Sequence, residues 1–397
     1  MNNKNVLILA FTLVVMMLGL GVIMPIIPFF IENLGAGGTE LGLLTAAYAF
    51  MRLIFGPVWG NLSDRYGRKP ILMIGVLGYG IAMIFFGLST RLWMLFLTRT
   101  LSGILSSATS PTTMAYISDT TSKEERGRGM GILGAAMGVG TILGPGLGGV
   151  LGGESISVPF FFAGGMSFLA LILIAIFLPE SLSDEKRRTF EDEKKSPPMK
   201  FVWEAVKSPI GILLLLAFLM TCGLMIFYGI FGLYALEKFG SQPAEVGVLF
   251  MVFGFVSALV QGLIIGPIIK RWGDAKVIQI SLILNAVGFI FIVLAPEFTT
   301  LLLATGVFTL GSSLLSPAVT SLTSKRADTN QGILMGISNS FMSLGRILGP
   351  LWAGLAFDIH IEIPFISGAF IMLAGFLISL KRIMEENGGN VVALTQN

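Results

Sequence analysis

Three arginine residues, Arg52, Arg99 and Arg346, fall within long apolar stretches of the chain. None of the 23 acidic residues does, because the carboxylates are confined to loops and to the ends of these stretches. A guanidinium group in apolar surroundings is costly unless it reaches water, carbonyl oxygens or an anion. We expect Arg52 and Arg346 to line a path for an anionic, zwitterionic or neutral amphipathic compound. The alternative is that the two side chains extend to the membrane surface, or that they pack inside the protein with their guanidinium groups bonded to carbonyl oxygens.

The residue types that support metal, redox or nucleophilic chemistry are nearly absent. The chain has one histidine, His360, and one cysteine, Cys222. These numbers exclude a His-pair zinc site, a cysteine cluster and an intramolecular disulfide, and no phosphate-binding loop or nucleophile–base set occurs. We predict no enzyme activity, no metal and no cofactor. The net charge of +3 does not indicate nucleic-acid binding, because the cations lie in loops beside apolar segments.

The composition is that of a polytopic membrane protein, with 54% hydrophobic and only 12% charged residues. A helix needs about 20 apolar residues to cross a bilayer. Twelve such segments are predicted, the first of them a retained helix and not a signal peptide. They are residues 6–30, 41–62, 71–89, 93–118, 128–152, 158–179, 209–236, 245–269, 276–295, 299–322, 331–356 and 363–381.

The chain repeats itself after six segments. Residues 106–111, with the sequence S-S-A-T-S-P, recur as S-S-L-L-S-P at 312–317, and the G-T-I-L-G-P of 140–145 recurs as G-R-I-L-G-P at 345–350. We predict a first half at 1–180, a linker at 181–208, a second half at 209–383 and a tail at 384–397. Most of the 26 lysine and arginine residues fall in alternate loops, which places both termini and the linker in the cytoplasm.

A charged turn, G-N-L-S-D-R-Y-G-R-K-P at residues 60–70, joins the second and third segments. Its glycines permit a tight reversal, and its cations hold the turn on the cytoplasmic side. Asp119, at the cytoplasmic end of the fourth segment, is placed to pair with Arg68. The echo at 266–274 is degenerate, and it supports the repeat without predicting a second turn of equal strength. The alternative to a functional role is that this charged turn is solvated and serves only to fix the orientation of the segments in the membrane.

The fifth segment carries glycines at i, i+4 and i+8, namely Gly140, Gly144 and Gly148, followed by Gly149. This spacing predicts a flat helix face that another helix can approach to backbone contact. Pro145 removes one backbone hydrogen bond and bends the segment. Generic packing of small residues is the alternative interpretation.

Four motifs together resemble one family. The charged turn resembles the loop between helices 2 and 3 of the major facilitator superfamily, and the Gly140–Gly149 pattern resembles the antiporter motif of its drug–proton exchanging branches. Residues 19–28 are similar to the first-helix signature of twelve-span drug exporters. Residues 95–103 are similar to their membrane-buried arginine motif, with Ser102 where glutamine is usual. The resemblance to bacterial tetracycline and multidrug proton antiporters extends over nearly the whole chain.

The resemblance implies an all-α membrane fold of twelve helices in two six-helix halves, monomeric and located in the bacterial plasma membrane. It implies export of amphipathic drugs by proton antiport through alternating access, with a small molecule, protons and the lipid bilayer as partners. It also implies that Asp64 caps helix 11 of the other half when the cytoplasmic side closes. A latch for the outward-facing state would then consist of Gly60, Asp64, Arg65, Gly67, Arg68 and Asp119.

The sequence departs from its relatives at the positions that could carry the proton. Tetracycline exporters have acids in helices 1 and 9, at places where this chain offers Met16, Met17 and Asn285. Arg99 is associated with proton transfer in the family, and a structural arginine bonded to helix-end carbonyls is the alternative. The carrier is left unassigned, with Asp64, Asp119 and Glu237 as weak candidates.

The substrate cavity is expected to combine Arg52 and Arg346 with polar and apolar side chains. The polar ones are Gln261, Asn285 and Asn339, and the apolar or aromatic ones are Met24, Phe30, Met51, Phe227, Tyr228, Phe231, Tyr234, Phe253 and Phe341. Arg52 and Arg346 also keep open an exporter or exchanger of an endogenous anionic, lipid or sugar-like metabolite. A membrane sensor without transport is disfavoured, because the turn and the glycine pattern are intact.

Overall fold

The computed structural model describes residues 3–182, 203, 205–208, 210–326 and 331–383, and these residues form helices and short connections without a β-strand. Most of the predicted linker and the whole predicted tail lie outside the described residues. By their internal contacts the residues form two compact units. Unit 1 comprises residues 1–195 and 232–254, and unit 2 comprises residues 196–231 and 255–397. Because this division passes through two helices, the predicted domain boundaries stay a prediction.

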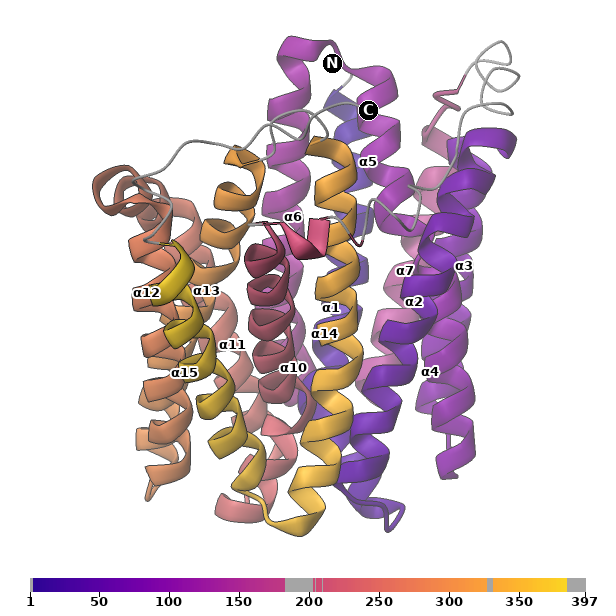
Figure 1. The fold of residues 1–397 in the computed structure, drawn as a ribbon. Coiled ribbons are helices and arrows are strands. Elements are labelled where there is room, and N and C mark those ends of the chain that lie inside the picture. Colours follow the sequence, from indigo (N-terminus) through magenta and orange to yellow (C-terminus); the bar gives the residue numbers. More distant parts are fainter. Residues whose placement is uncertain (1–2, 183–202, 204, 209, 327–330, 384–397) are drawn as a thin grey trace. The chain divides into compact units, whose positions relative to one another are not determined.

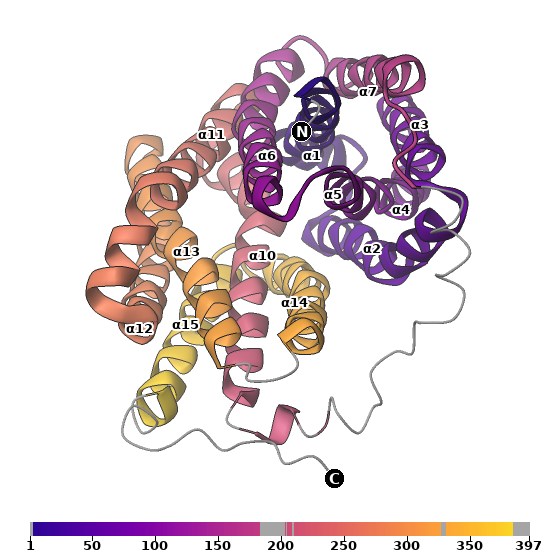
Figure 2. The same cartoon turned by 90° about the horizontal axis from the view of Figure 1, so that it is seen from above.

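Seven helices belong wholly to unit 1 (Figure 1). They are α1 (Asn3–Asn33), α2 (Gly38–Tyr66), α3 (Arg68–Gly87), α4 (Leu92–Ser106), α5 (Thr109–Thr120), α6 (Lys123–Gly152) and α7 (Val158–Phe177). Unit 1 also contains the end of α10 (Gly211–Phe239) and most of α11 (Pro243–Leu259). Seen from above, α6 and α7 lie beside α1, and α4 and α7 lie beside α3 (Figure 2).

Helix α4 ends and α5 begins within one predicted segment, at Ser107–Ala108. Pro111 has no backbone N–H to donate to the carbonyl of Ser107, so the hydrogen-bond ladder is interrupted there. At the end of α4 the carbonyl oxygen of Ile104 accepts the indole N–H of Trp59 on α2, at 2.7 Å, and the hydroxyl of Ser107, at 2.6 Å. The two short helices therefore form one spanning element with a weak point in its backbone.

Unit 2 contains the start of α10, the π-helical turn η1 (Val260–Ile264), α12 (Ile265–Leu294), α13 (Phe298–Lys325), α14 (Gln331–Ile359) and α15 (Ile363–Ile383). Gly273 has a φ of 76° in the middle of α12, which turns that helix into two. The first part continues α11 and η1, and the second part begins at Asp274. Only glycine adopts this backbone conformation without strain.

These elements reproduce the twelve predicted segments in order. Among the described residues, nine helical stretches are long and apolar enough to cross a membrane, and one of them, Pro243–Leu294, is the pair divided at Gly273. The joined α4–α5 and the less apolar α14 supply the remaining spans. Most helices extend several residues beyond the predicted limits, because a helix does not end where its apolar pattern ends.

The core of unit 1 gathers around α1. Side chains such as Leu9, Leu13, Leu72 and Ile174, from α1, α3 and α7, are fully buried together. At the other end of α1 the ring of Phe30 packs edge-on against Phe160, with 5.6 Å between the centroids. This helix is thus held along its length, and its neighbours are positioned by it.

Candidate functional site

The charged turn folds into a buried ion cluster at one end of unit 1. Gly67, with a φ of 106°, ends α2 and begins α3, so that Arg68 turns back toward the last turn of α2. The Arg68 Nη1 atom lies 2.5 Å from Asp64 Oδ1 and also donates to the hydroxyl of Ser63 at 2.7 Å. The Arg68 Nε atom lies 2.9 Å from Asp119 Oδ2. The expected Arg68–Asp119 pair is therefore present.

Burial makes this cluster costly to disturb. Arg68 is only 4% exposed and Asp64 only 9%. Breaking a buried pair by removing one partner leaves an uncompensated charge, which typically costs about 3–5 kcal/mol. Gly60 and Arg65, which the sequence also assigned to the latch, lie on the rim, with Arg65 exposed and Gly60 partly exposed.

A third carboxylate, that of Glu180 just after α7, completes the cluster. It accepts the backbone N–H groups of Arg68 at 2.9 Å and Lys69 at 3.1 Å. A positive side chain at a helix N-terminus opposes the helix dipole, and the Glu180 carboxylate compensates for it. The sequence contained Glu180 among the span-end acids, but no periodicity or spacing distinguished it. Only the return of α7 to the start of α3 gives it a role.

The echo in unit 2 is an ion pair of reversed polarity. Asp274 and Lys325 lie 206 positions after Arg68 and Asp119, and their side chains pair at 2.5 Å. Asp274 is buried, whereas the side chain of Lys325 is 59% exposed. This pair agrees with the expectation of a repeat whose second turn is weaker than the first.

Two of the arginines within the spans lie around one tyrosine in unit 1. The guanidinium carbon of Arg99 on α4 is 4.4 Å from the centroid of the Tyr48 ring, and that of Arg52 is 5.6 Å from it. The Tyr48 hydroxyl is 3.2 Å from Ser106 Oγ, which fixes the ring. Buried Nε and Nη1 of Arg99 have no hydrogen-bond partner among the described residues. Neither of these two nitrogen atoms is therefore bonded to a helix-end carbonyl in the described part of the chain, which was the alternative interpretation of Arg99.

Below Arg99, buried polar side chains continue along α4 and α5 toward Asp119. Ser102 and Ser106 are followed by Thr109, Thr113 and Tyr116 at intervals of three or four residues, all of them buried. The Oγ1 atoms of Thr109, Thr112 and Thr113 lack partners in the part of the chain that is described. Tyr116 donates to the carbonyl of Pro179 at 2.8 Å. These side chains form a polar stripe that runs from Arg99 to the ion cluster.

The glycine face of α6 packs on α1, as its spacing predicts. A Cβ atom at Gly140 would lie 2.6 Å from the carbonyl oxygen of Val14, and one at Gly144 would lie 2.7 Å from that of Leu18. Gly148 approaches the carbonyl of Val22 in the same way. Pro145 lies against Gly21 of α1. Gly149 belongs to another face and contacts Pro243–Gly247 of unit 1.

Six residues predicted to line the cavity are buried in the structure, namely Phe30, Phe227, Phe231, Tyr234, Phe253 and Asn285. Phe227 is 0% exposed and stacks on Phe231 and Phe308, with centroids 4.2 and 4.6 Å away. Asn285 is 2% exposed; its amide donates to the carbonyl of Ser281, and its oxygen accepts the hydroxyl of Ser312. Residue type alone misled the prediction, because aromatic and amide side chains serve packed helix interfaces as readily as cavities.

The remaining predicted cavity residues are exposed or partly buried in the structure. Arg346, Gln261 and Asn339 are exposed, while Arg52, Met24 and Tyr228 are partly buried. Gln261 lies in the π-helical turn η1, a departure from α-geometry that often accompanies functional sites. These residues belong to both units, and their joint role stays a prediction.

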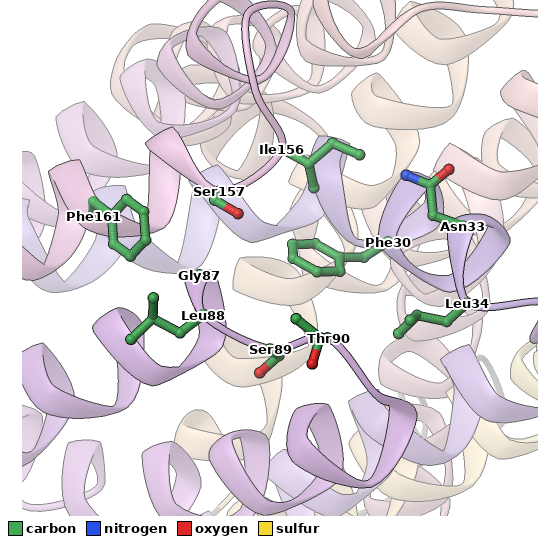
Figure 3. A pocket seen from close by; sticks show the side chains of 10 residues that line it. All are labelled: Phe30, Asn33, Leu34, Gly87, Leu88, Ser89, Thr90, Ile156, Ser157 and Phe161. Atoms are coloured by element: carbon green, nitrogen blue, oxygen red, sulfur yellow. The ribbon is translucent and has the colours of Figure 1, made fainter.

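A separate cavity of about 530 Å³ opens at the end of unit 1 away from the ion cluster (Figure 3). The ring of Phe30 projects into it, between Ile156 and the Ser89–Thr90 segment. Of the residues predicted for a cavity, only Phe30 is among its lining. The lining residues are Phe30, Asn33, Leu34, Gly87, Leu88, Ser89, Thr90, Ile156, Ser157 and Phe161.

Sequence comparison decides the family. The sequence profile of the Major Facilitator Superfamily matches residues 9–260 and 213–394. The chain belongs to the Major Facilitator Superfamily. Members of this superfamily are transporters, so the chain is a multi-pass transport protein for small molecules and not an enzyme.

Full-length relatives place the chain among the efflux members of the Major Facilitator Superfamily. It is 32% identical to Multidrug resistance protein 2 of Bacillus subtilis over 389 residues, covering 98% of this chain and 97% of the relative. It is 30% identical to the quinolone resistance protein NorA of Staphylococcus aureus over 394 residues, covering 97% and 100%.

Solved structures of the superfamily share the fold at low sequence identity. A bacterial homologue of the human lysosomal transporter Spinster, in an inward-facing conformation, matches with a TM-score of 0.77 and 16% identity, covering 96% of this chain and 98% of that one. The human organic anion transporter MFSD10 matches with a TM-score of 0.67 and 20% identity, covering 95% and 99%. These likenesses support the all-α arrangement of twelve helices in two six-helix halves.

Proposed function

We propose that this protein exports amphipathic drugs, of the multidrug or tetracycline type, across the bacterial plasma membrane in exchange for protons. The observation that carries the proposal is the likeness, over almost the whole chain and at 30% identity or more, to a multidrug and a quinolone resistance protein. Both termini lie in the cytoplasm in this proposal, since the lysine and arginine residues gather in the loops on that side.

Export proceeds by alternating access, and the ion cluster is its latch. Arg68, held by Asp64, Asp119 and Glu180, fixes the junction of α2 and α3 to the ends of α5 and α7. The family resemblance implies that in the outward-facing state Asp64 caps the eleventh spanning segment, which is α14 in the structure. The buried pairs give the two arrangements distinct energies, which a two-state transporter requires.

Protons act through the carboxylates that hold Arg68. No carboxylate lies among the apolar spans of the sequence, so the proton must bind at a span end. Protonation of Asp64 or Asp119 removes the charge that holds Arg68 and releases the latch toward the inward-facing state. Arg99 is linked to Asp119 by the polar stripe along α4 and α5, and through this stripe it transmits the state of the substrate site to Asp119.

The test is drug-driven proton movement in proteoliposomes with an imposed pH gradient. Internal pH is recorded while ethidium, tetracycline, a fluoroquinolone and an anionic amphiphile are added in turn. We expect at least one of the drugs to move protons, and Asp64→Asn and Asp119→Asn to abolish the movement. Glu154→Gln, at an exposed acid in the α6–α7 loop, is the matched control and should leave it intact.

Two outcomes would contradict the proposal. Uptake or exchange of the anionic amphiphile without proton movement by any drug would indicate a metabolite exporter. Proton movement that survives both aspartate substitutions would remove the latch carboxylates from the coupling step.

A further inference from the structure

Two positive charges share one aromatic ring inside unit 1. The Tyr48 ring holds the guanidinium groups of Arg99 and Arg52 at 4.4 and 5.6 Å from its centroid. A cation–π contact offsets only part of the cost of placing an arginine in a membrane interior. The ring therefore positions the two cations but does not neutralise them.

No carboxylate among the described residues forms an ion pair with Arg52 or Arg99. Nε and Nη1 of Arg99 are buried and unpartnered among the described residues, and Arg52 makes no hydrogen bond or ion pair with the residues the structure describes. The hydroxyl of Tyr79, which lies within electrostatic range of both arginines, is likewise buried without a partner in that part of the chain. Unpartnered guanidinium N–H groups and neutral hydroxyls thus meet around Tyr48, without an ion pair to either arginine among the described residues.

The two arginines differ in access. Arg99 is 7% exposed, whereas Arg52 is partly exposed on α2. Arg52 is therefore the more accessible of the two guanidinium groups that contact the Tyr48 ring. Guanidinium groups bind carboxylates by two parallel hydrogen bonds, which sets the chemistry of the ligand.

We propose that Arg52, Tyr48 and Arg99 form the binding site for a carboxylate carried by an amphipathic, zwitterionic or anionic substrate. This inference rests on the proposed function and narrows its substrate class. It differs from the sequence expectation, which joined Arg52 to Arg346, because the site lies within unit 1 and needs no residue of unit 2. An ester lacks the negative charge and the two equivalent oxygens of a carboxylate, so the site should bind it less tightly.

The experiment compares an acid with its ester. Equilibrium binding of ciprofloxacin, of its methyl ester and of ethidium, which lacks a carboxylate, is measured on the purified full-length protein in lipid nanodiscs. In the unmodified protein we expect the acid to bind at least about tenfold more tightly than the ester. Arg52→Gln should bring this ratio close to one while ester and ethidium binding are retained.

Control variants separate charge from folding. Arg91→Gln removes an exposed arginine at the start of α4 and should leave the ratio unchanged. Arg52→Lys keeps the charge without the paired N–H groups, and should retain only part of the preference. The thermal midpoint of each variant confirms that it is folded.

Equal affinity for acid and ester, or a ratio that Arg52→Gln does not alter, would overturn the inference. So would the absence of carboxylate binding altogether. If the binding preference holds but no drug moves protons in the proteoliposome assay, the proposed function fails while the site stands. If ethidium drives proton movement but acid and ester bind alike, the site fails while the function stands.

Discussion

The turns at Gly67 and Gly273 use similar backbones for opposite charges. Each has a glycine of positive φ between two helices, and each places a buried ionic residue at the start of the second helix. In unit 1 that residue is Arg68, whose charge opposes the helix dipole. In unit 2 it is Asp274, whose charge is favourable at the same position.

The difference explains why only one turn gathers several acids. Arg68 needs Glu180 to satisfy the N-terminus of α3, and Asp64 and Asp119 to balance its own charge. Asp274 pairs through Oδ2 with the exposed Lys325, while its Oδ1 is buried without a partner among the described residues. Because the charge is inverted, the turn in unit 1 gathers three carboxylates, whereas the turn in unit 2 forms a single ion pair. In the proposed function, the carboxylates that bind the proton therefore belong to unit 1.

The largest expected effect comes from truncating the central cation. Arg68→Ala should lower the free energy of unfolding by about 3–5 kcal/mol, because it leaves buried carboxylates without their partner. Lys325→Ala, the corresponding deletion in the other pair, should cost less than Arg68→Ala, because it leaves one carboxylate without its partner and not two. The thermal midpoints of both variants in one detergent measure the difference. Equal losses would show that the two turns are equally strong.

A smaller effect is expected from the cap of α3. Glu180→Gln keeps the shape but removes the charge that offsets Arg68, and should cost about 1–2 kcal/mol. The same substitution at exposed Glu154 is the control and should be neutral. Amide hydrogen exchange should accelerate at the start of α3 in the Glu180 variant alone. Unchanged protection there would mean that the carboxylate is not a cap.

The smallest effect tests the inverted pair itself. Asp274→Lys should destabilise the protein, and adding Lys325→Asp should restore most of that loss through a re-formed pair. The residual difference, within about 1 kcal/mol, reflects the unfavourable lysine at the helix start. A double variant no better than the single one would show that Asp274 does not depend on Lys325.

Much of the fold could be predicted from the chain alone. The spans, the positive-φ turn and the contact of the Gly140 face with another helix follow from local rules of length, conformation and spacing. The Arg68–Asp119 pair also followed, because both residues lie at the same end of neighbouring segments.

The remaining features depend on which helix faces which. Glu180 is unremarkable until α7 returns beside α3, and Arg52 and Arg99 become neighbours only when α2 packs on α4. Asn285 and Phe227 were placed in a cavity by residue type, yet their helix faces turn toward α13. Helix rotation about its own axis is weakly encoded in segments that are apolar on all sides.

The interruption between α4 and α5 has a mechanical consequence. A continuous helix transmits rotation along its axis, whereas a missing hydrogen bond at Ser107 makes the element compliant at that level. Arg99 lies on one side of this joint and Asp119 on the other. The corresponding Pro317 lies within an uninterrupted α13. Pro317 also lacks a backbone N–H, but α13 continues through it, whereas the first element is interrupted. Bending should therefore be concentrated in the element that carries both Arg99 and Asp119.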